Sequence, residues 1–492
     1  MLAPVWASAA TLEVFPPVTS DMVAQRDQPI AVLGRAAPAA EVAATFAGQT
    51  VKGRADSDGL WRVLLPAQAA NTNAQDLVVT AGSERVVCTN ILVGDVWVCS
   101  GQSNMQFDMG GLANQYAEIT AATHPLIRLL LVPNVIAAGP TNRVRATWRV
   151  CDPASVRKFS AVGYYFGREL QQHLGIPIGL IAASWGGTVA EAWTPLPALA
   201  ASSVLSNALA RQTQAEIVYR ANLAKYTPAL ADWQAKGCPT NIAKPMLPPS
   251  PESQNAPSRL YNAMIHPLTP YPVRGFIWYQ GESNEGRAKE YNLLLSTMIR
   301  AWRTAWNRDD LPFLIVQLAA YRAPQTAANQ PPSGWALLRE AQYQTATGMP
   351  LCGIATAIDI GDEHNIHPKN KLDVGRRLAL QARRVAYGEK LVAGGPALRA
   401  VQIEGDRLRL VFDDIGGGLV AHGPELRGFA IAGADRKFVW AQARIDGATV
   451  LVSAREVPAP QVVRYAFADN PADANLFNAE GLPAYPFRTD KP

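Results

Sequence analysis

The sequence predicts an α/β protein in which a central layered domain is flanked by a β domain at each end. Three observations support this: the length of 492 residues, short apolar runs near both termini, and helical periods in between. At roughly 150 residues per domain, this length corresponds to about three domains. The predicted domains cover residues 1–93, 94–390 and 391–492.

The two terminal segments have the pattern of β domains. Their apolar runs are short, are separated by turn residues and show no helical period. We therefore expect an N-terminal β-sandwich and a C-terminal β domain. The predicted strands lie at residues 12–15, 30–33, 60–65, 77–80, 408–412, 450–452 and 462–465.

Residues 94–390 alternate strand-like runs with helical periods, which predicts a parallel sheet with helices on both sides. Each predicted strand is apolar nearly throughout, as expected for a parallel strand covered on both faces. The clearest helix follows Gly286, and a second is expected at 372–385. Residues 195–258 contain a Pro-rich tract and are typical of an insertion over the rim of a site. The predicted strands are 95–99, 178–182, 273–279, 313–318 and 354–358.

Composition and charge exclude several classes of protein. The net charge of +5 is small for this length and its basic residues are scattered among acidic ones, so no nucleic-acid partner is expected. No apolar run approaches the roughly 20 residues of a bilayer span, so no membrane insertion is expected. The five cysteines show no metal-ligand spacing and are expected to be buried thiols.

The first residues carry a weak targeting signal. Residues 7–9 read Ala-Ser-Ala, the small-x-small pattern that precedes signal cleavage. We interpret them as the remnant of an export signal, which predicts a periplasmic or secreted protein. An ordinary Ala-rich N-terminus is the alternative.

Four of the predicted strands end in polar, glycine-containing loops. In a parallel α/β sheet, ligands bind at the carboxyl ends of the strands, so these loops are the candidate site. Together they supply a hydroxyl, side-chain amides, carboxylates and imidazoles. The loops are GQSNM at 101–105, SWGGT at 184–188, QGESN at 280–284 and DIGDEHNIHP at 359–368.

This set of groups fits acyl transfer, because a weak hydroxyl nucleophile needs a base and its oxyanion needs prearranged donors. Ser103 is the candidate nucleophile. Histidine is the usual base because its pKa is close to working pH. Of the six histidines, only His364 and His367 follow a predicted strand within a carboxylate-rich turn. No Gly-x-Ser-x-Gly surrounds any serine, which argues against an α/β-hydrolase elbow.

The loops, in this order, resemble the motifs of sialate O-acetylesterase-type carbohydrate esterases of the SGNH (GDSL-like) hydrolase superfamily. The resemblance also includes residues 21–30 and 481–490, so it covers nearly the whole chain. It implies an SGNH-type three-layer α/β/α central domain. It also implies serine-dependent hydrolysis of O-acetyl esters on carbohydrate, without cofactor or metal. The motifs are GQSNM, SWGGT with EAWT behind it, WYQGESN and NIHPKNK.

The resemblance assigns the central catalytic roles. Ser103 would be the nucleophile that forms an acetyl-enzyme, and His367 would take its proton and later activate water. The oxyanion donors would be the backbone N–H of Ser103, a backbone N–H of Gly187 (or Gly186) and the side-chain amide of Asn284. The expected substrate contacts are Gln102, Trp185, Gln280 and Glu282.

The third member of the triad is less defined. Many members of the superfamily place Asp three residues before the catalytic histidine, but His364 occupies that position here. Asp362 is our choice for orienting His367, with Glu363 and Asp359 as alternatives. A Ser-His dyad stays open, since a backbone carbonyl can orient an imidazole.

Other interpretations compete with these. Glu282 and Asp362 could form a glycosidase pair, but Ser103 and His367 would then have no role, and Glu282 would more simply brace the site. The acidic turn at 359–364 offers no second group of metal ligands. The substrate could be acetylated sialic acid or acetylated xylan or xyloglucan, with aromatic stacking by Trp185, Trp193 and Tyr279. A non-catalytic carbohydrate-binding protein is the competing class.

Overall fold

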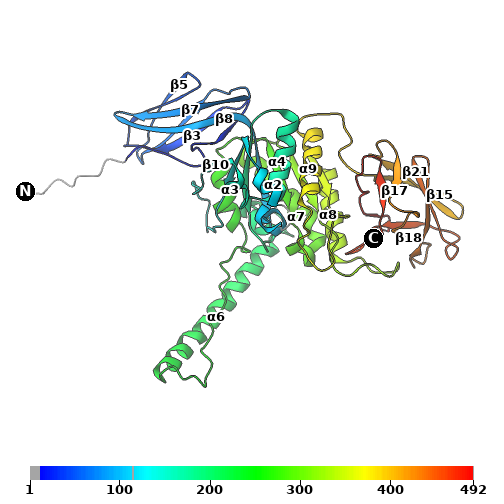
Figure 1. Cartoon of the computed structure of the whole chain (residues 1–492). Coiled ribbons are helices and arrows are strands. Elements are labelled where there is room, and N and C mark those ends of the chain that lie inside the picture. The colour runs from blue at the N-terminus through cyan, green and yellow to red at the C-terminus, as the bar shows by residue number, and fades with distance from the viewer. Residues whose placement is uncertain (1–10, 113–115, 491–492) are drawn as a thin grey trace, which may run out of the picture.

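The computed structural model describes residues 11–112 and 116–490. Figure 1 shows the N-terminal strands, in blue, at one end of the molecule and the C-terminal strands, in orange and red, at the other. The helices of the central part lie between them. The protein is thus a mixed α/β molecule with several sheets, as predicted. Residues 7–9, which carry the export prediction, lie outside the described residues.

The central sheet consists of parallel strands with one antiparallel strand at its edge. Each of the five predicted central strands overlaps an observed one, whereas β9 and β10 have no counterpart among the predictions. Across the sheet, the order is β10 (Trp148–Cys151), β9 (His124–Leu131), β11 (Ile178–Ser184), β8 (Glu84–Gly101), β12 (Gly275–Tyr279), β13 (Phe313–Gln317) and β14 (Cys352–Thr356).

Two pairs of helices, α4 with α9 and α7 with α8, pack on this sheet. Trp97 of β8 contacts Phe166 of α4, and Phe276 of β12 contacts Trp302 of α7, with ring centroids 5.1 and 5.3 Å apart. Phe276 is in register with Val98, the residue after Trp97. Because successive strand residues face opposite sides, α4 and α7 cover opposite faces.

The helical elements of the described chain include several short 3-10 turns and one π-helical turn next to the strand ends. In chain order they are α1 (Ser103–Gln106), η1 (Met109–Gly111), α2 (Tyr116–Ala121), α3 (Pro153–Val156), α4 (Ala161–Leu174), η2 (Ala190–Trp193), α5 (Leu196–Ala200), α6 (Asn207–Ala235), η3 (Tyr261–Ile265), η4 (His266–Leu268), η5 (Glu282–Arg287), α7 (Ala288–Ala305), α8 (Gly334–Gly348) and α9 (Lys371–Val385).

One strand, β8, belongs to both the N-terminal part and the central sheet. Its first part pairs with β7 and β2, and its residues from Asp95 onward pair with β11 and β12. The boundary predicted between residues 93 and 94 therefore lies inside a continuous strand. The other N-terminal strands are β1 (Glu13–Val14), β2 (Val23–Gln25), β3 (Ile30–Arg35), β4 (Glu41–Phe46), β5 (Gln49–Arg54), β6 (Leu60–Leu65) and β7 (Asn71–Ala81).

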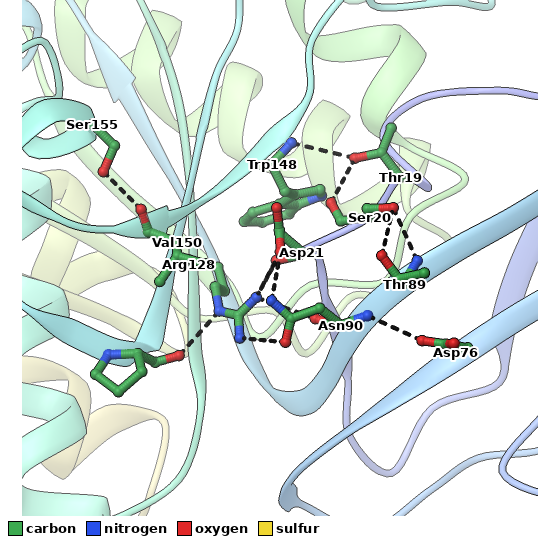
Figure 2. Close-up of polar contacts among 11 residues, drawn as sticks. Thr19, Ser20, Asp21, Asp76, Thr89, Asn90, Arg128, Trp148, Val150 and Ser155 are labelled. Atoms are coloured by element: carbon green, nitrogen blue, oxygen red, sulfur yellow. Dashed lines mark hydrogen bonds and ion pairs between the residues drawn. The ribbon is translucent and has the colours of Figure 1, made fainter.

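A buried arginine joins the N-terminal part to the central sheet (Figure 2). Arg128 of β9 is only 3% exposed. Its guanidinium donates to the Asn90 carbonyl at 3.1 Å, to the Asn90 side chain at 3.2 Å and to the Asp21 carbonyl at 3.2 Å. Asn90 in turn donates to the Asp21 carboxylate at 2.6 Å. These charge-assisted bonds hold the N-terminal part against β9.

The predicted insertion contains a long helix that leaves the body of the molecule. Figure 1 shows α6 extending away from the central part. Of its residues, only Ala208 is buried. The return segment is held to the helix where Trp233 Nε1 donates to the Ile242 carbonyl at 3.1 Å. Neither α6 nor any other described helix is long and apolar enough to cross a membrane.

The C-terminal strands form three small antiparallel sheets around a hydrophobic core of their own. The buried guanidinium of Arg339, in α8, donates to the carbonyls of Leu318 and Ala468 at 2.8 and 2.6 Å, which attaches these sheets to the end of β13. The strands are β15 (Ala397–Glu404), β16 (Arg407–Asp413), β17 (Leu419–Ala421), β18 (Phe429–Ala432), β19 (Val439–Trp440), β20 (Gln442–Asp446), β21 (Thr449–Ser453), β22 (Val462–Tyr465), β23 (Leu476–Asn478) and β24 (Phe487–Arg488).

We expect Arg128→Met to destabilise the protein by about 2–4 kcal/mol, because buried carbonyls lose a charged donor. Urea unfolding measures the change. Arg62→Met, at an exposed arginine of β6, is the matched control and should change stability by less than about 0.5 kcal/mol. Equal unfolding midpoints for the two variants would show that the Arg128 bonds do not hold the sheets together.

Candidate active site

Three of the four candidate loops follow adjacent strands. Gly101, at the end of β8, is in register with Ser184 of β11 on one side and Tyr279 of β12 on the other. The fourth loop follows β14, two strands beyond β12. All four therefore leave the sheet at its carboxyl edge, where the topology of a parallel sheet places ligands.

A glycine makes the first turn possible. Gly101 has φ +138°, and a Cβ added there would lie 2.1 Å from the carbonyl oxygen of Tyr279. Only glycine fits this close approach. The chain then turns into α1, whose first residue is the half-buried Ser103. The buried Gln102 side chain accepts the N–H groups of Gly281 and Ser283 at 3.4 and 3.3 Å, which ties this turn to the third loop.

The second loop passes directly over the serine. A Cβ added to Gly186 would lie 3.2 Å from the Cβ of Ser103. The N–H of Gly186 donates to the Gln106 side chain at 2.7 Å. In contrast, the N–H groups of Ser103 and Gly187 have no acceptor among the described residues. Both N–H groups are therefore free to donate to another acceptor.

Asn255, near the end of the insertion, braces this loop from outside. Its amide nitrogen donates to the Gly187 carbonyl at 3.1 Å, and its oxygen accepts the Val189 N–H at 2.9 Å. The sequence prediction assigns residues 195–258 to the rim without naming this contact. No local pattern marks Asn255, because its partners lie more than sixty residues away.

Asn284 is buried and joins the second and third loops. Its Nδ2 donates to Glu191 Oε2 at 2.8 Å, and its Oδ1 accepts the Ala190 N–H at 2.9 Å and Gln280 Nε2 at 2.7 Å. Glu191 is also held by Arg287 at 2.7 Å. The second hydrogen on Nδ2 is not used by these bonds. Asn284 thus has a framework role and one spare donor.

The first and fourth loops meet through the neighbours of Ser103 and His367. Asn104 Nδ2 donates to the Ile366 carbonyl at 3.0 Å. The ring of Phe107 lies 6.3 Å from the His367 ring, centroid to centroid. Serine and histidine therefore lie on the same edge of the sheet. No hydrogen bond joins their side chains among the described residues, but such bonds are often long before substrate binds.

The surroundings of His367 favour its neutral form. Burial lowers the pKa of His367, and the positive charges of Lys371 and Lys369 lower it further. Both lysines lie against the Phe107 ring, at 5.3 and 4.6 Å from its centroid. No carboxylate contacts the imidazole among the described residues.

The acidic residues of the fourth loop have separate partners. Asp359 makes a two-point ion pair with Arg377 at 2.6 and 2.7 Å. Glu363 pairs with His364 at 2.8 Å. Asp362 Oδ1 accepts the N–H groups of residues 364 and 365, at 2.9 and 3.1 Å, and so supports the turn before the histidine. Within the described chain, no group of three or more His, Cys, Asp or Glu could hold a metal ion.

Comparisons with known proteins identify the family of the chain. A family model for carbohydrate esterase, sialic acid-specific acetylesterase matches residues 93–226 and 229–384. The chain belongs to this family. The resemblance predicted from the sequence is thereby confirmed.

Relatives and one solved structure extend the comparison. Sialate O-acetylesterase of Homo sapiens is 31% identical over 430 residues, which cover 78% of this chain and 73% of that protein. The Mus musculus protein is 31% identical over 337 residues, or 64% of this chain and only 60% of its own length. The crystal structure of a carbohydrate acetylesterase from Xanthomonas citri covers 98% of this chain and 100% of its own, with TM-score 0.84 and 37% identity.

The expected substrate contacts in this family member differ in exposure. Gln102 and Gln280 are buried, and the Oε2 atom of Glu282 is buried as well. Trp185, which belongs to the second loop, is half-buried. Trp193 and Tyr279, which the sequence suggests as stacking residues, are 0% exposed and pack in the core. Trp185 is therefore the predicted aromatic contact that reaches the surface.

We expect the imidazole of His367 to titrate below the ordinary value of about 6.5, because burial and two cations disfavour its charged form. NMR titration of the histidines, with His367→Asn for assignment, measures this. Lys369→Met should raise the pKa of His367, whereas Lys437→Met, at an exposed lysine elsewhere, should leave it unchanged. A wild-type value above 6.5 would contradict the electrostatic argument.

Proposed function

We propose that the protein is a serine carbohydrate O-acetylesterase, which hydrolyses O-acetyl esters on sugars through an acetyl-enzyme. The observation that carries this proposal is the Asn104–Ile366 hydrogen bond, which brings the turn of Ser103 to the loop of His367. The names of the family and of its relatives support the same activity.

The proposed reaction has two acyl-transfer steps. The Ser103 hydroxyl oxygen attacks the acetyl carbonyl carbon while His367 takes the hydroxyl proton. The tetrahedral intermediate collapses, the sugar oxygen leaves with the proton from His367, and acetyl-Ser103 is formed. Water then attacks this ester with His367 as base, which releases acetate and restores Ser103. A lowered pKa suits His367 to this role, because only the neutral imidazole accepts the proton.

The free N–H groups of Ser103 and Gly187, with the spare hydrogen of the Asn284 amide, are proposed as oxyanion donors. Each such donor typically contributes about 2.7–4 kcal/mol of transition-state stabilisation. The bonds of Asn284 to Glu191 and Ala190 support this assignment, because they hold the amide in one orientation before substrate arrives.

For the third position, we propose that Asp362 orients His367 through the backbone of its turn. Asp362 accepts two N–H groups of this turn, and Asn365 Oδ1 then accepts the N–H of His367 at 2.9 Å. Asp359 is a weaker candidate because Arg377 occupies its carboxylate, and Glu363 faces His364.

The finer architecture is also a proposal. We assign residues 94–390 to an SGNH-type three-layer α/β/α hydrolase domain, flanked by a β-sandwich and a C-terminal β domain. The parallel sheet with helices on both faces supports this assignment. Acetylated sialic acid is the proposed substrate, by the description of the family, and the proposed location is the periplasm or the cell exterior.

Ser103→Ala and His367→Asn should each lower kcat for p-nitrophenyl acetate by about 10³-fold or more, because neither acylation nor proton transfer can proceed. Ser83→Ala, at an exposed serine between β7 and β8, is the control and should retain full activity. The same variants are then assayed for acetate release from acetylated sialic acid, xylan and xyloglucan. Full activity of Ser103→Ala would remove the proposed nucleophile, and the absence of any turnover would favour a binding protein.

Substitutions at Asp362 separate a turn role from direct contact with the imidazole. Asp362→Asn should change kcat by less than about threefold, because an amide oxygen accepts the same two N–H groups. Asp362→Ala should lower kcat by about 10- to 100-fold through a misplaced imidazole. Steady-state kinetics on an acetyl ester measures both. If Asp362→Asn is as damaging as Asp362→Ala, the carboxylate acts on the imidazole directly.

A further inference from the structure

A chain of buried polar groups lies between the two catalytic loops. The side chain of Asn104 is at its centre and uses both of its N–H hydrogens as well as its oxygen. Its oxygen accepts Lys371 Nζ, and its nitrogen donates to Glu282 Oε1 at 2.6 Å and to the Ile366 carbonyl at 3.0 Å. The amide is therefore held in a single orientation.

The two charged ends of this chain are unusual in their burial. Lys371, the first residue of α9, is 1% exposed, and its amine lies 5.3 and 5.4 Å from the ring centroids of Phe107 and Tyr279. Glu282 Oε2 is buried without a hydrogen-bond partner in the described chain. Burial lowers the pKa of Lys371 to about 7 and raises the pKa of Glu282. Groups of this kind seldom add net stability, because desolvation offsets their attraction.

The location of the chain indicates what it does instead. Asn104 follows Ser103 directly, Ile366 precedes His367 directly, and Lys371 begins the helix after the histidine loop. Motion of either loop would leave the Asn104 amide with unpaired buried groups, which is costly. In addition, no carboxylate of the described residues contacts the imidazole, so the usual side-chain support of a catalytic histidine is missing here.

We propose that Glu282, Asn104 and Lys371 form a positioning device that sets the Ser103 hydroxyl against the His367 imidazole. They act on the residues next to Ser103 and His367. A triad aspartate, in contrast, would contact the imidazole itself. This inference rests on the proposed esterase function. It assigns Glu282 and Lys371 to positioning, not to contact with the sugar.

The device also has an electrostatic effect on the base. The charged groups that act on His367 are Lys369 and Lys371, and those that act on Lys371 are Glu282 and Lys369. Removal of the Lys371 charge takes a repulsion away from the imidazolium. The acid limb of kcat/KM, where the base becomes protonated, should then move to higher pH.

Three variants test the device with p-nitrophenyl acetate. Lys371→Met keeps most of the length of the side chain without its charge. It should lower kcat by about 100-fold, change KM by less than about threefold, and move the acid limb up by about half a pH unit. Asn104→Ser removes the amide that links Glu282 to Lys371 but keeps the lysine charge. It should therefore lower kcat similarly without moving the acid limb of kcat/KM. The double variant should lose no more than either single variant, because both break one device.

Two controls complete the experiment. Arg303→Met removes another buried cation, which lies in α7 and donates to the Leu311 carbonyl at 2.9 Å. It should lower the unfolding temperature without changing kcat or the acid limb. Propylamine added to Lys371→Ala should restore part of kcat, while propanol should not. If Lys371→Met does not fold, the Asn104→Ser variant still tests the positioning device.

The outcomes separate this inference from the proposed function. Suppose that Ser103→Ala is inactive while Lys371→Met and Asn104→Ser keep kcat within threefold of the wild type. This result would overturn the positioning device but not the proposed function. Additive losses in the double variant would also overturn it. An active Ser103→Ala would instead overturn the proposed function.

Discussion

The structure depends on one continuous strand. β8 runs from the N-terminal sheet into the centre of the parallel sheet and ends at Gly101, where no side chain fits against the Tyr279 carbonyl. The strand is paired along both parts of its length, so its end cannot move independently of either sheet. Ser103 is therefore presented from a rigid element, with its neighbours placed by the strands beside it.

Polar groups, not apolar contacts, organise the edge of the sheet beyond β8. Asn104, Asn255 and Asn284 each connect segments that are far apart in the chain. An amide offers donors and an acceptor at once, so it fixes two backbones in a defined orientation. The apolar core beneath supplies most of the stability, while these amides determine how the loops lie relative to one another.

Much of the fold follows from local pattern. The apolar runs of β11, β12, β13 and β14 are uninterrupted, and each is found in the structure. By contrast, β9 contains Pro125 and the buried Arg128, which break the pattern that identifies a covered strand. A charged residue inside such a strand is explained only by partners from another part of the chain, here Asp21 and Asn90.

The sequence by itself determined the family, five strands of the central sheet, and the loops that carry Ser103, His367 and Asn284, because motifs and periodicity are local properties of the chain. Only the tertiary structure decided which groups support them. Lys371 looks like a surface residue in the sequence but is buried, and no local pattern marks Asn255. The separate partners of Asp362, Asp359 and Glu363 are not visible in the sequence either. Their partners differ because hydrogen bonds and burial depend on distance in space, which sequence separation does not give.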